Sequence, residues 1–338
     1  MAEDKELDQF ELITVEVLKA LYCDKILERP YQLYRINTLS GSRIYFRFLE
    51  DGSPRYYLGT TSFSSEIKMT EQLIKWWCNM GYDNAKKYIY KRSVHGSFFH
   101  RILAEIQNDN GIDMRFQMKI YEKYLEEYRI PQNDWYSLMD EMEKDILSYL
   151  QFHFDYKLKP LAIELPLCSE SDSVATLVDF VGTIDDRLVS PVTGKIYKPR
   201  NRECYGEHGA NIDWKTGKGG FYASNIFQLE ANRTLMQENY PNVFPVDHYY
   251  NVAPKNWRGD TPTYTISEQT NKFDLDDYDM LIHKGRKMLQ RLLEREVRVI
   301  NGAIKLGEDP TKRLEKKALY KIIEDNEWEQ YKINYAPI

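Results

Sequence analysis

The stretch that decides the fold is NIDWKTG, residues 211–217, which lies downstream of the segment FVGTIDD, residues 180–186. In a β-strand, side chains two positions apart point to the same face and lie roughly 7 Å apart. A strand through the first stretch would place Asp213 and Lys215 on one face, and the apolar residues beside Asp213 would face a core. The second segment, as a neighbouring strand, adds another acid, Asp185.

Two carboxylates beside a lysine point to a particular chemistry. Carboxylate oxygens are ligands for Mg²⁺ and Mn²⁺, and a bound divalent ion lowers the pKa of its water. A lysine near that ion can orient the water or stabilise negative charge on a phosphate. Asp185, Asp213 and Lys215 therefore form a candidate site for metal-dependent phosphodiester hydrolysis.

The composition is that of a soluble globular protein. The 338 residues are 42% hydrophobic and 29% charged, enough for one large domain or two smaller ones. No apolar run approaches the roughly 20 residues that span a bilayer, and the acidic N-terminus lacks the apolar stretch of a secretory signal. The four cysteines show no CxxC spacing, which favours reduced thiols. We therefore expect a cytoplasmic protein with no membrane partner.

The first half of the chain is predicted to be mainly helical after a β-hairpin. Residues 31–61 alternate like a hairpin closed by Asp51 and Gly52. Helical patterns follow in residues 64–108 and 114–154, with breaks predicted near Gly81, near Ser93 and at Pro131.

Strands dominate from about residue 158, and the class is α/β with a mixed sheet flanked by helices. The predicted strands are 158–167, 174–185, 210–215, 243–252 and 261–267. The predicted helices are 220–239, a long one that begins at Asp274 and ends near residue 301, and a last one over about 310–330.

Several motifs in this order resemble one nuclease family. GTIDD, then IDWKTG, then a helix carrying Gln228 in FQLEANRTL look like motifs of RecB-like nucleases in the PD-(D/E)XK superfamily. Upstream, VHGSFFHRIL matches the family's G-x-x-x-H helix with Gly96 and His100, and residues from TSFSSEI onward are similar to the lead-in of phage-type exonucleases and the mitochondrial genome maintenance exonuclease. The likeness covers residues 55–240, and five weak motifs in register make a strong combined signal.

The resemblance implies a fold and a division of the chain. It implies a PD-(D/E)XK, restriction-endonuclease-like core with a central mixed sheet and a helical N-terminal elaboration. Residues 1–155 would hold the hairpin and the G-x-x-x-H helix, and residues 156–338 the nuclease core with C-terminal helices, as one continuous unit.

The resemblance also implies roles for individual residues. Lys215 would be the catalytic lysine, and Gln228 would reach the substrate or the attacking water. Asn232 stands where the family usually has a tyrosine, which puts one substrate contact in doubt. The implied metal ligands are Asp185, Asp213, His100, the backbone carbonyl of Ile212 or of Trp214, and Glu164 in preference to Glu105. Because His100 is an imidazole, Mn²⁺ suits this set better than Mg²⁺.

A basic insert lies between the two ligand-bearing segments. The insert is either a solvated hairpin or a set of phosphate contacts, and its basic residues are Lys195, Lys198, Arg200 and Arg202. Lys218, in the glycine-rich stretch after Lys215, is a further candidate phosphate contact. The net charge of −6 gives no whole-molecule attraction to nucleic acid, but local basic patches supply one.

Other cofactors are not indicated. KTGKGG lacks the spacing of a nucleotide-binding phosphate loop. Cys204 and His208 have no second pair nearby for zinc, and no cysteine follows Cys204 for the family's iron–sulfur cluster.

These observations lead to a functional prediction. We expect a metal-dependent DNA exonuclease that acts on single strands or DNA ends in recombination, repair or phage genome processing. A recombination or single-strand-binding protein would be a fitting partner, and a phage-encoded protein would work in the host cytoplasm. The alternatives are an endonuclease of the same superfamily and an inactive nucleic-acid-binding protein, which the intact Asp185, Asp213 and Lys215 argue against.

Overall fold

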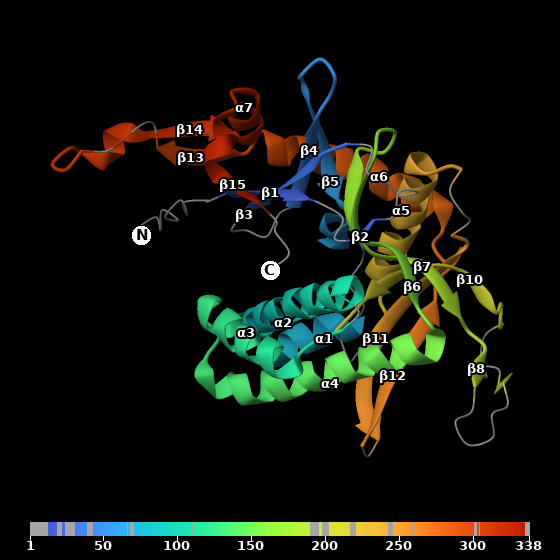
Figure 1. Ribbon diagram of the computed structural model, residues 1–338. Helices are drawn as coiled ribbons and strands as arrows, with labels where there is room; N and C mark the ends of the chain where they lie inside the picture. Colours follow the sequence, from blue (N-terminus) through green and yellow to red (C-terminus); the bar gives the residue numbers. More distant parts are fainter. Residues whose placement is uncertain are drawn as a thin grey trace.

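The computed structural model has an α/β fold built on one large mixed sheet (Figure 1). It describes residues 13–18, 22–23, 31–38, 43–65, 67, 71–109, 111–189, 196–197, 203–216, 221–242, 246–258, 260–300, 303 and 305–334. Within these ranges, no helix has the length and apolar character needed to cross a membrane. Cys78, Cys168 and Cys204 are free thiols.

The large sheet has 11 strands in its described part. Its main path runs β12-β11-β10-β7-β5-β4-β3-β1-β15, and β2 and β6 pair beside β7. The strands are β1 (Ile13–Leu18), β2 (Tyr22–Cys23), β3 (Leu33–Thr38), β4 (Arg43–Phe48), β5 (Pro54–Gly59), β6 (Lys159–Ser169), β7 (Val174–Asp185), β10 (Glu207–Trp214), β11 (His248–Arg258), β12 (Thr261–Glu268) and β15 (Lys332–Asn334). Strands from before and from after residue 155 pair with one another within this one sheet.

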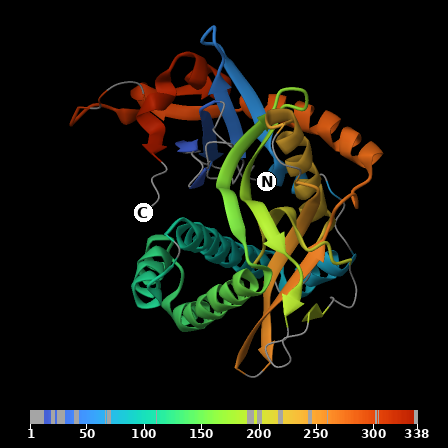
Figure 2. The same cartoon turned by 45° about the vertical axis from the view of Figure 1, so that its right-hand side comes forward.

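Helices lie on both sides of the sheet. They are α1 (Glu71–Met80), α2 (Tyr82–Asp109), α3 (Met114–Glu127), α4 (Gln132–Tyr156), α5 (Ala223–Asn239), α6 (Leu275–Leu293) and α7 (Leu319–Glu324). Apolar side chains of α2, α3 and α4 form one core with β7, β10 and β11. A second core joins α5 and α6 to the N-terminal strands and to β6. Figure 2 shows the long strands β6 and β7 running between these helical layers.

Short elements complete the fold. Two small sheets pair β8 (Leu188–Val189) with β9 (Ile196–Tyr197) and β13 (Glu296–Ile300) with β14 (Leu314–Ala318). The 3₁₀ helices are η2 (Thr60–Ser65), η3 (Pro310–Arg313) and η4 (Glu327–Tyr331).

Most predicted elements are present, with three differences. The hairpin of β4 and β5 turns at Gly52, which has φ 79°, and Gly81 at φ 73° separates α1 from α2. Ser93 does not interrupt α2, because α2 contains no proline that would remove a backbone donor. The helix capped by Asp274 ends at Leu293, and β13 follows from Glu296 with the β-branched residues Val297, Val299 and Ile300. The C-terminal helix predicted over 310–330 is instead η3, β14, α7 and η4.

One edge of β7 is divided between two partners, and this division positions the site. β5 pairs with its first residues, Val174 and Ala175, and β10 pairs with it from Phe180 onward. Between these pairings β5 ends at Gly59 and the chain turns away into η2. The sheet therefore opens beside residues 176–179 of β7, where Thr176, Leu177 and Asp179 line a pocket.

Candidate metal centre

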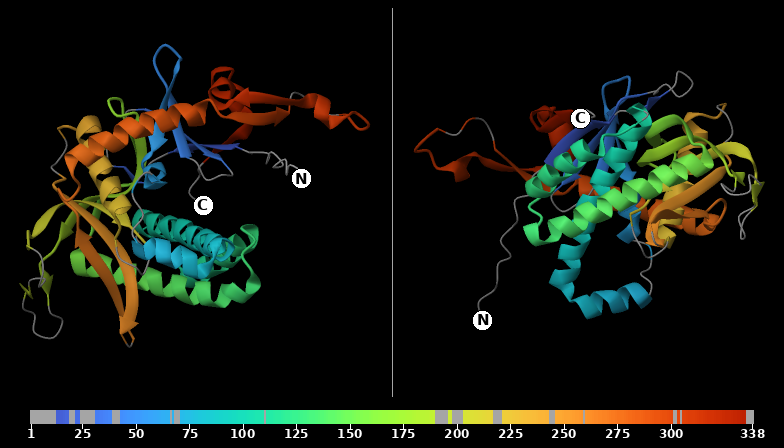
Figure 3. Two further views of the ribbon diagram at one scale, coloured as in Figure 1. Left: turned by 180° about the vertical axis from the view of Figure 1, so that it is seen from behind. Right: turned by 60° about the horizontal axis from the view of Figure 1, so that its bottom comes forward.

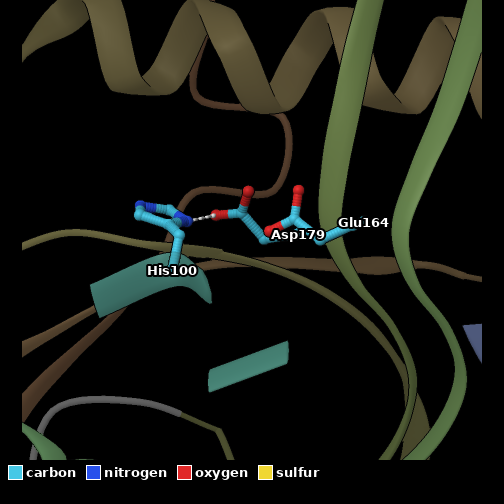
Figure 4. Close-up of side chains that lie close together, drawn as sticks. All are labelled: His100, Glu164 and Asp179. Atoms are coloured by element: carbon cyan, nitrogen blue, oxygen red, sulfur yellow. Dashed lines mark ion pairs between the residues drawn. The ribbon is translucent and has the colours of Figure 1, made fainter. Parts of the chain in front are cut away.

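Three ligand-type side chains meet where the sheet opens. His100, Glu164 and Asp179 each offer one ligand atom, and these atoms all lie within 4.8 Å of one another. Nδ1 of His100 lies 3.4 Å from Oδ2 of Asp179 (Figure 4). The two carboxylates are buried and the imidazole is partly exposed. One nitrogen and two carboxylates from three separate elements form a recognisable set of donors for a divalent ion.

The helix that carries His100 lies close to the end of β10. A Cβ added to Gly96, one turn earlier on α2, would lie 3.3 Å from Oγ1 of Thr216. A glycine at this position therefore lets α2 approach the chain just after the lysine motif, as expected for the G-x-x-x-H pattern. His100 is thereby brought to the carboxylates of the sheet.

Glu164 has an unusual backbone conformation inside a strand. Its φ is 51°, in the left-handed region, which costs a non-glycine residue about 1–3 kcal/mol. The conformation also interrupts the side-chain alternation of β6, since Ala162 and Leu165, three positions apart, belong to the same core. Backbone strain of this kind clusters at functional sites, because the surrounding fold must hold the residue in place.

The acid and lysine of the NIDWKTG stretch lie beside this cluster. Nζ of Lys215 lies 2.8 and 2.7 Å from the two carboxylate oxygens of Asp213 and donates to Oε1 of Gln228 at 3.1 Å. Nδ2 of Asn251, on the adjacent strand, donates to Asp213 at 2.7 Å. Trp214 packs against the aromatic rings of α4 instead. The predicted division of faces along this strand is therefore present.

Burial and crowding shift the pKa values of the clustered groups. Burial, together with the nearby Asp179 charge, raises the pKa of Glu164 to about 8. Burial also raises the pKa of Asp213 to about 6, although Lys215 opposes this shift. Burial disfavours the His100 imidazolium, but the Asp179 carboxylate outweighs it and raises the pKa of His100 to about 9. The cluster is thus a buried set of acids that are incompletely neutralised by neighbouring cations.

A pocket of about 370 Å³ opens over these residues. Its lining combines the cluster with Asp213, Lys215 and Gln228, and adds hydroxyl and guanidinium groups from the N-terminal strands, η2 and α2. These additional groups include Arg35, Arg43, Thr60, Arg92 and Ser97. Arg35 pairs with Glu16, and Arg92 pairs with Glu141, whereas no ion pair within the described ranges involves Arg43. The arginines were not among the sequence candidates.

Asp185, predicted as a metal ligand, lies outside the pocket. Its carboxylate accepts hydrogen bonds from the side chains of Arg187 at 2.8 and 2.9 Å and Lys157 at 3.0 Å. These partners hold the pKa of Asp185 well below its usual range. The strand register explains the difference, because Asp185 lies opposite Glu207, at the far end of β10 from Asp213.

Asp179 takes the position that had been expected for Asp185. Its Oδ2 accepts a hydrogen bond from the backbone N–H of Trp214 at 2.9 Å, and the register continued past Ile212 and Phe180 places it opposite Asp213. Asp179 and Asp185 are six positions apart along β7, about 20 Å in a strand. A lone acid within the apolar run LVDFV was the available signal in the sequence.

The other sequence candidates have varied positions. Ile212 is a buried core residue paired with Phe180 on one side and Tyr250 on the other. Glu105 is held by Arg101 and Gln117 rather than facing the pocket. Asn232 is buried, and neither amide atom has a hydrogen-bond partner within the described ranges. The predicted phosphate contacts Lys195, Lys198, Arg200, Arg202 and Lys218 lie outside the described residues.

Comparison with known proteins adds no relative. No protein-family model matches the sequence, and no curated protein matches it. The function of this chain is therefore inferred from its motifs and from the geometry of this site.

Proposed function

We propose that the protein is a metal-dependent nuclease with a PD-(D/E)XK core that hydrolyses phosphodiester bonds in DNA. The observation that carries the proposal is the gathering of His100, Glu164, Asp179, Asp213 and Lys215 around one pocket. These residues come from α2, β6, β7 and β10 and from the residue after β10. A fold that serves only as a scaffold has no need to bury so many charged groups at a shared opening.

The residues present fit a divalent ion. His100, Glu164 and Asp179 would hold it, with Asp213 beside them. The raised pKa of Glu164 comes first from burial and then from the nearby Asp179 charge, and a divalent cation bound there would oppose both effects. When bound, the ion lowers the pKa of a coordinated water and neutralises charge on the phosphate.

The remaining residues of the pocket have roles that follow from their contacts. The Lys215 ammonium is held by Asp213 and Gln228 at the pocket wall, where it can orient the attacking water or stabilise the phosphate in the transition state. Because Oε1 of Gln228 accepts from Lys215, its NH₂ group stays available to donate to a phosphate oxygen. Arg43 adds a guanidinium to the same wall.

DNA is the proposed substrate, and exonuclease action is favoured over endonuclease action. Two things support this choice: the motif resemblance and a pocket that is large enough for a nucleotide-sized group. Recombination, repair and phage genome processing are the settings in which such an activity serves.

The decisive experiment compares linear and circular DNA. End-labelled single- and double-stranded linear DNA, beside a circular control, is incubated with Mn²⁺, Mg²⁺ or EDTA, and Lys215→Ala runs in parallel. We expect metal-dependent loss of linear DNA alone, with the variant slower by roughly 100- to 1,000-fold. Cleavage of the circle would establish an endonuclease. Equal cleavage by the variant, or none by the wild type with either metal, would refute the catalytic assignment and leave a binding role.

A further inference from the structure

An exposed aromatic surface lies beside the pocket, on α1 and the first half of α2. Figure 3 (right) shows these segments standing away from the body of the molecule. Ile74, Tyr82, Tyr88, Ile89 and Tyr90 are each 44% to 63% exposed there. Large apolar side chains gathered on an exposed face mark a binding surface. We name residues 71–93 the aromatic arm.

The rings of the aromatic arm contact one another. The ring centroid of Trp76 lies 5.8 Å from that of Trp77 and 5.6 Å from that of Tyr88. Trp77 in turn lies 6.0 Å from Tyr82. The rings therefore form a linked group across α1 and α2 and offer several aromatic faces to one ligand.

The charge of the aromatic arm favours an anionic ligand. Residues 71–93 contain five lysines and arginines and two acids, a net charge of +3, against −6 for the whole chain. Lys91 and Arg92 pair with acids of α4, so Lys86 and Lys87 are the cations of the arm that carry the argument. Nζ of Lys86 lies over one face of the Tyr82 ring, 4.5 Å from its centroid, and Tyr82 is still 63% exposed. Aromatic side chains interleaved with cations are typical of single-strand binding surfaces, because bases stack on rings while cations contact phosphates.

The aromatic arm is continuous with the pocket along one face of α2. Residues spaced three or four apart share a helix face; here they are Tyr82, Lys86, Ile89, Ser93, Gly96 and His100. Tyr82 and His100 are 18 positions apart, about five helical turns and roughly 27 Å. Ser93, Gly96 and His100 line the pocket, so the same face passes from exposed rings to the candidate metal ligands.

We infer that the aromatic arm binds single-stranded DNA and guides it along this face of α2 into the pocket. The inference rests on the proposed function, because the candidate active site at the end of the face decides which polymer is guided. Bases stack on Tyr82 and its neighbouring rings, and Lys86 contacts phosphate. The length of roughly 27 Å holds about eight nucleotides at a rise of about 3.4 Å, and fewer in a stretched strand.

The test is a binding measurement in EDTA, where no metal-dependent cleavage occurs. Fluorescence anisotropy reports the affinity for labelled oligothymidylate of about 20 nucleotides, longer than the face can hold. Tyr82→Ala should weaken binding at least about fivefold, the lower end for losing one stacked base, while Tyr82→Trp should retain it. Lys86→Ala should make the negative slope of log affinity against log salt concentration less steep by about 0.7. Tyr82→Ala should leave this slope unchanged.

Matched controls come from α4. Tyr136 is 87% exposed, and Lys144 is half-exposed on the same helix, so Tyr136→Ala and Lys144→Ala remove the same kinds of side chain outside the aromatic arm. Both control variants should bind oligothymidylate like the wild type. Thermal unfolding of each variant checks that it is folded.

Three results would overturn the inference: unchanged affinity in Tyr82→Ala and Lys86→Ala, equal losses in the α4 controls, or no binding of oligothymidylate by the wild type. In the case of unchanged affinity, loss of binding to phosphatidylserine–phosphatidylcholine vesicles in Tyr82→Ala, or dissociation of a dimer, would assign the surface to a membrane or to a second copy of the chain instead. Binding is measured without metal, so failure of the nuclease proposal in the cleavage assay does not affect this outcome.

Discussion

Asp179 and Asp185 provide a direct test of the candidate metal centre, because they lie on the same strand and differ in their surroundings. Asp179 belongs to the cluster with His100 and Glu164, whereas Asp185 is held by Arg187 and Lys157. We predict that Asp179→Asn removes the stabilisation of the fold by Mn²⁺ and that Asp185→Asn retains it.

The magnitude follows from binding linkage. At a metal concentration about 100 times its Kd, a ligand that binds only the folded state stabilises it by about 2.7 kcal/mol. Loss of one of three clustered ligand atoms should raise the Kd at least about 100-fold, which leaves about 0.4 kcal/mol at the same concentration. At about 2.1 cal/mol/K per residue, the unfolding entropy of 338 residues is about 0.7 kcal/mol/K. Mn²⁺ should therefore raise the Tm by about 4 °C in the wild type and by less than about 1 °C in Asp179→Asn.

Asp185→Asn should have a different signature. Its partners Arg187 and Lys157 are 49% and 57% exposed, so solvent weakens both ion pairs to about 0.5–1 kcal/mol in total. Asparagine keeps an acceptor for the Arg187 backbone N–H. The Tm should fall by about 1 °C without metal, and the Mn²⁺-induced rise should persist.

Differential scanning fluorimetry or calorimetry with and without Mn²⁺ measures both effects, and cleavage assays of the same variants add a second readout. If Asp185→Asn lost the Mn²⁺-induced rise while Asp179→Asn kept it, the assignment of ligands from the structure would be refuted. A wild type that Mn²⁺ does not stabilise would refute the centre itself.

Three further predictions concern the same site and its supporting sheet. The pKa values of about 9 for His100 and about 8 for Glu164 leave both groups protonated at neutral pH, so metal binding must release both protons. The affinity for Mn²⁺ should therefore rise with pH, by up to about 100-fold per pH unit below pH 8. Calorimetric Mn²⁺ titrations at pH 7 in buffers of different ionisation enthalpy should give nearly two protons released, and a pH-independent affinity would contradict this. Gln228→Leu should slow cleavage about 10- to 100-fold, because the contact to Lys215 is lost, while Mn²⁺ still raises the Tm. If Mn²⁺ no longer raised the Tm of this variant, Gln228 would be assigned to metal binding instead. Gly182→Ala should destabilise the fold by about 1–3 kcal/mol, because its Cβ would lie 2.3 Å from a backbone carbonyl; an unchanged Tm would argue against this packing.

Local patterns predicted the elements best where a specific residue enforces them. Gly52 forms the turn between β4 and β5, and Gly81 separates α1 from α2, both where predicted, because each adopts a positive φ that other residues avoid. Asp274 begins α6 as predicted, because its carboxylate accepts from the first free backbone N–H groups. The C-terminal region was predicted wrongly as helical, because the pairing of β13 with β14 is a tertiary contact that no local pattern specifies.

The sequence by itself determined the α/β class, the placement of Asp213 and Lys215 on one strand face, and the candidacy of His100, Glu164 and Gln228. The class and the shared strand face follow from local periodicity, whereas the candidacy of His100, Glu164 and Gln228 is what the motif resemblance implies. Only the tertiary structure decided which acid of β7 lies beside them. Asp179 and Asp185 share the same side-chain parity, and the choice depends on the register between β7 and β10 and on where β5 leaves the sheet. Register is a property of paired strands, so no pattern within one strand specifies it.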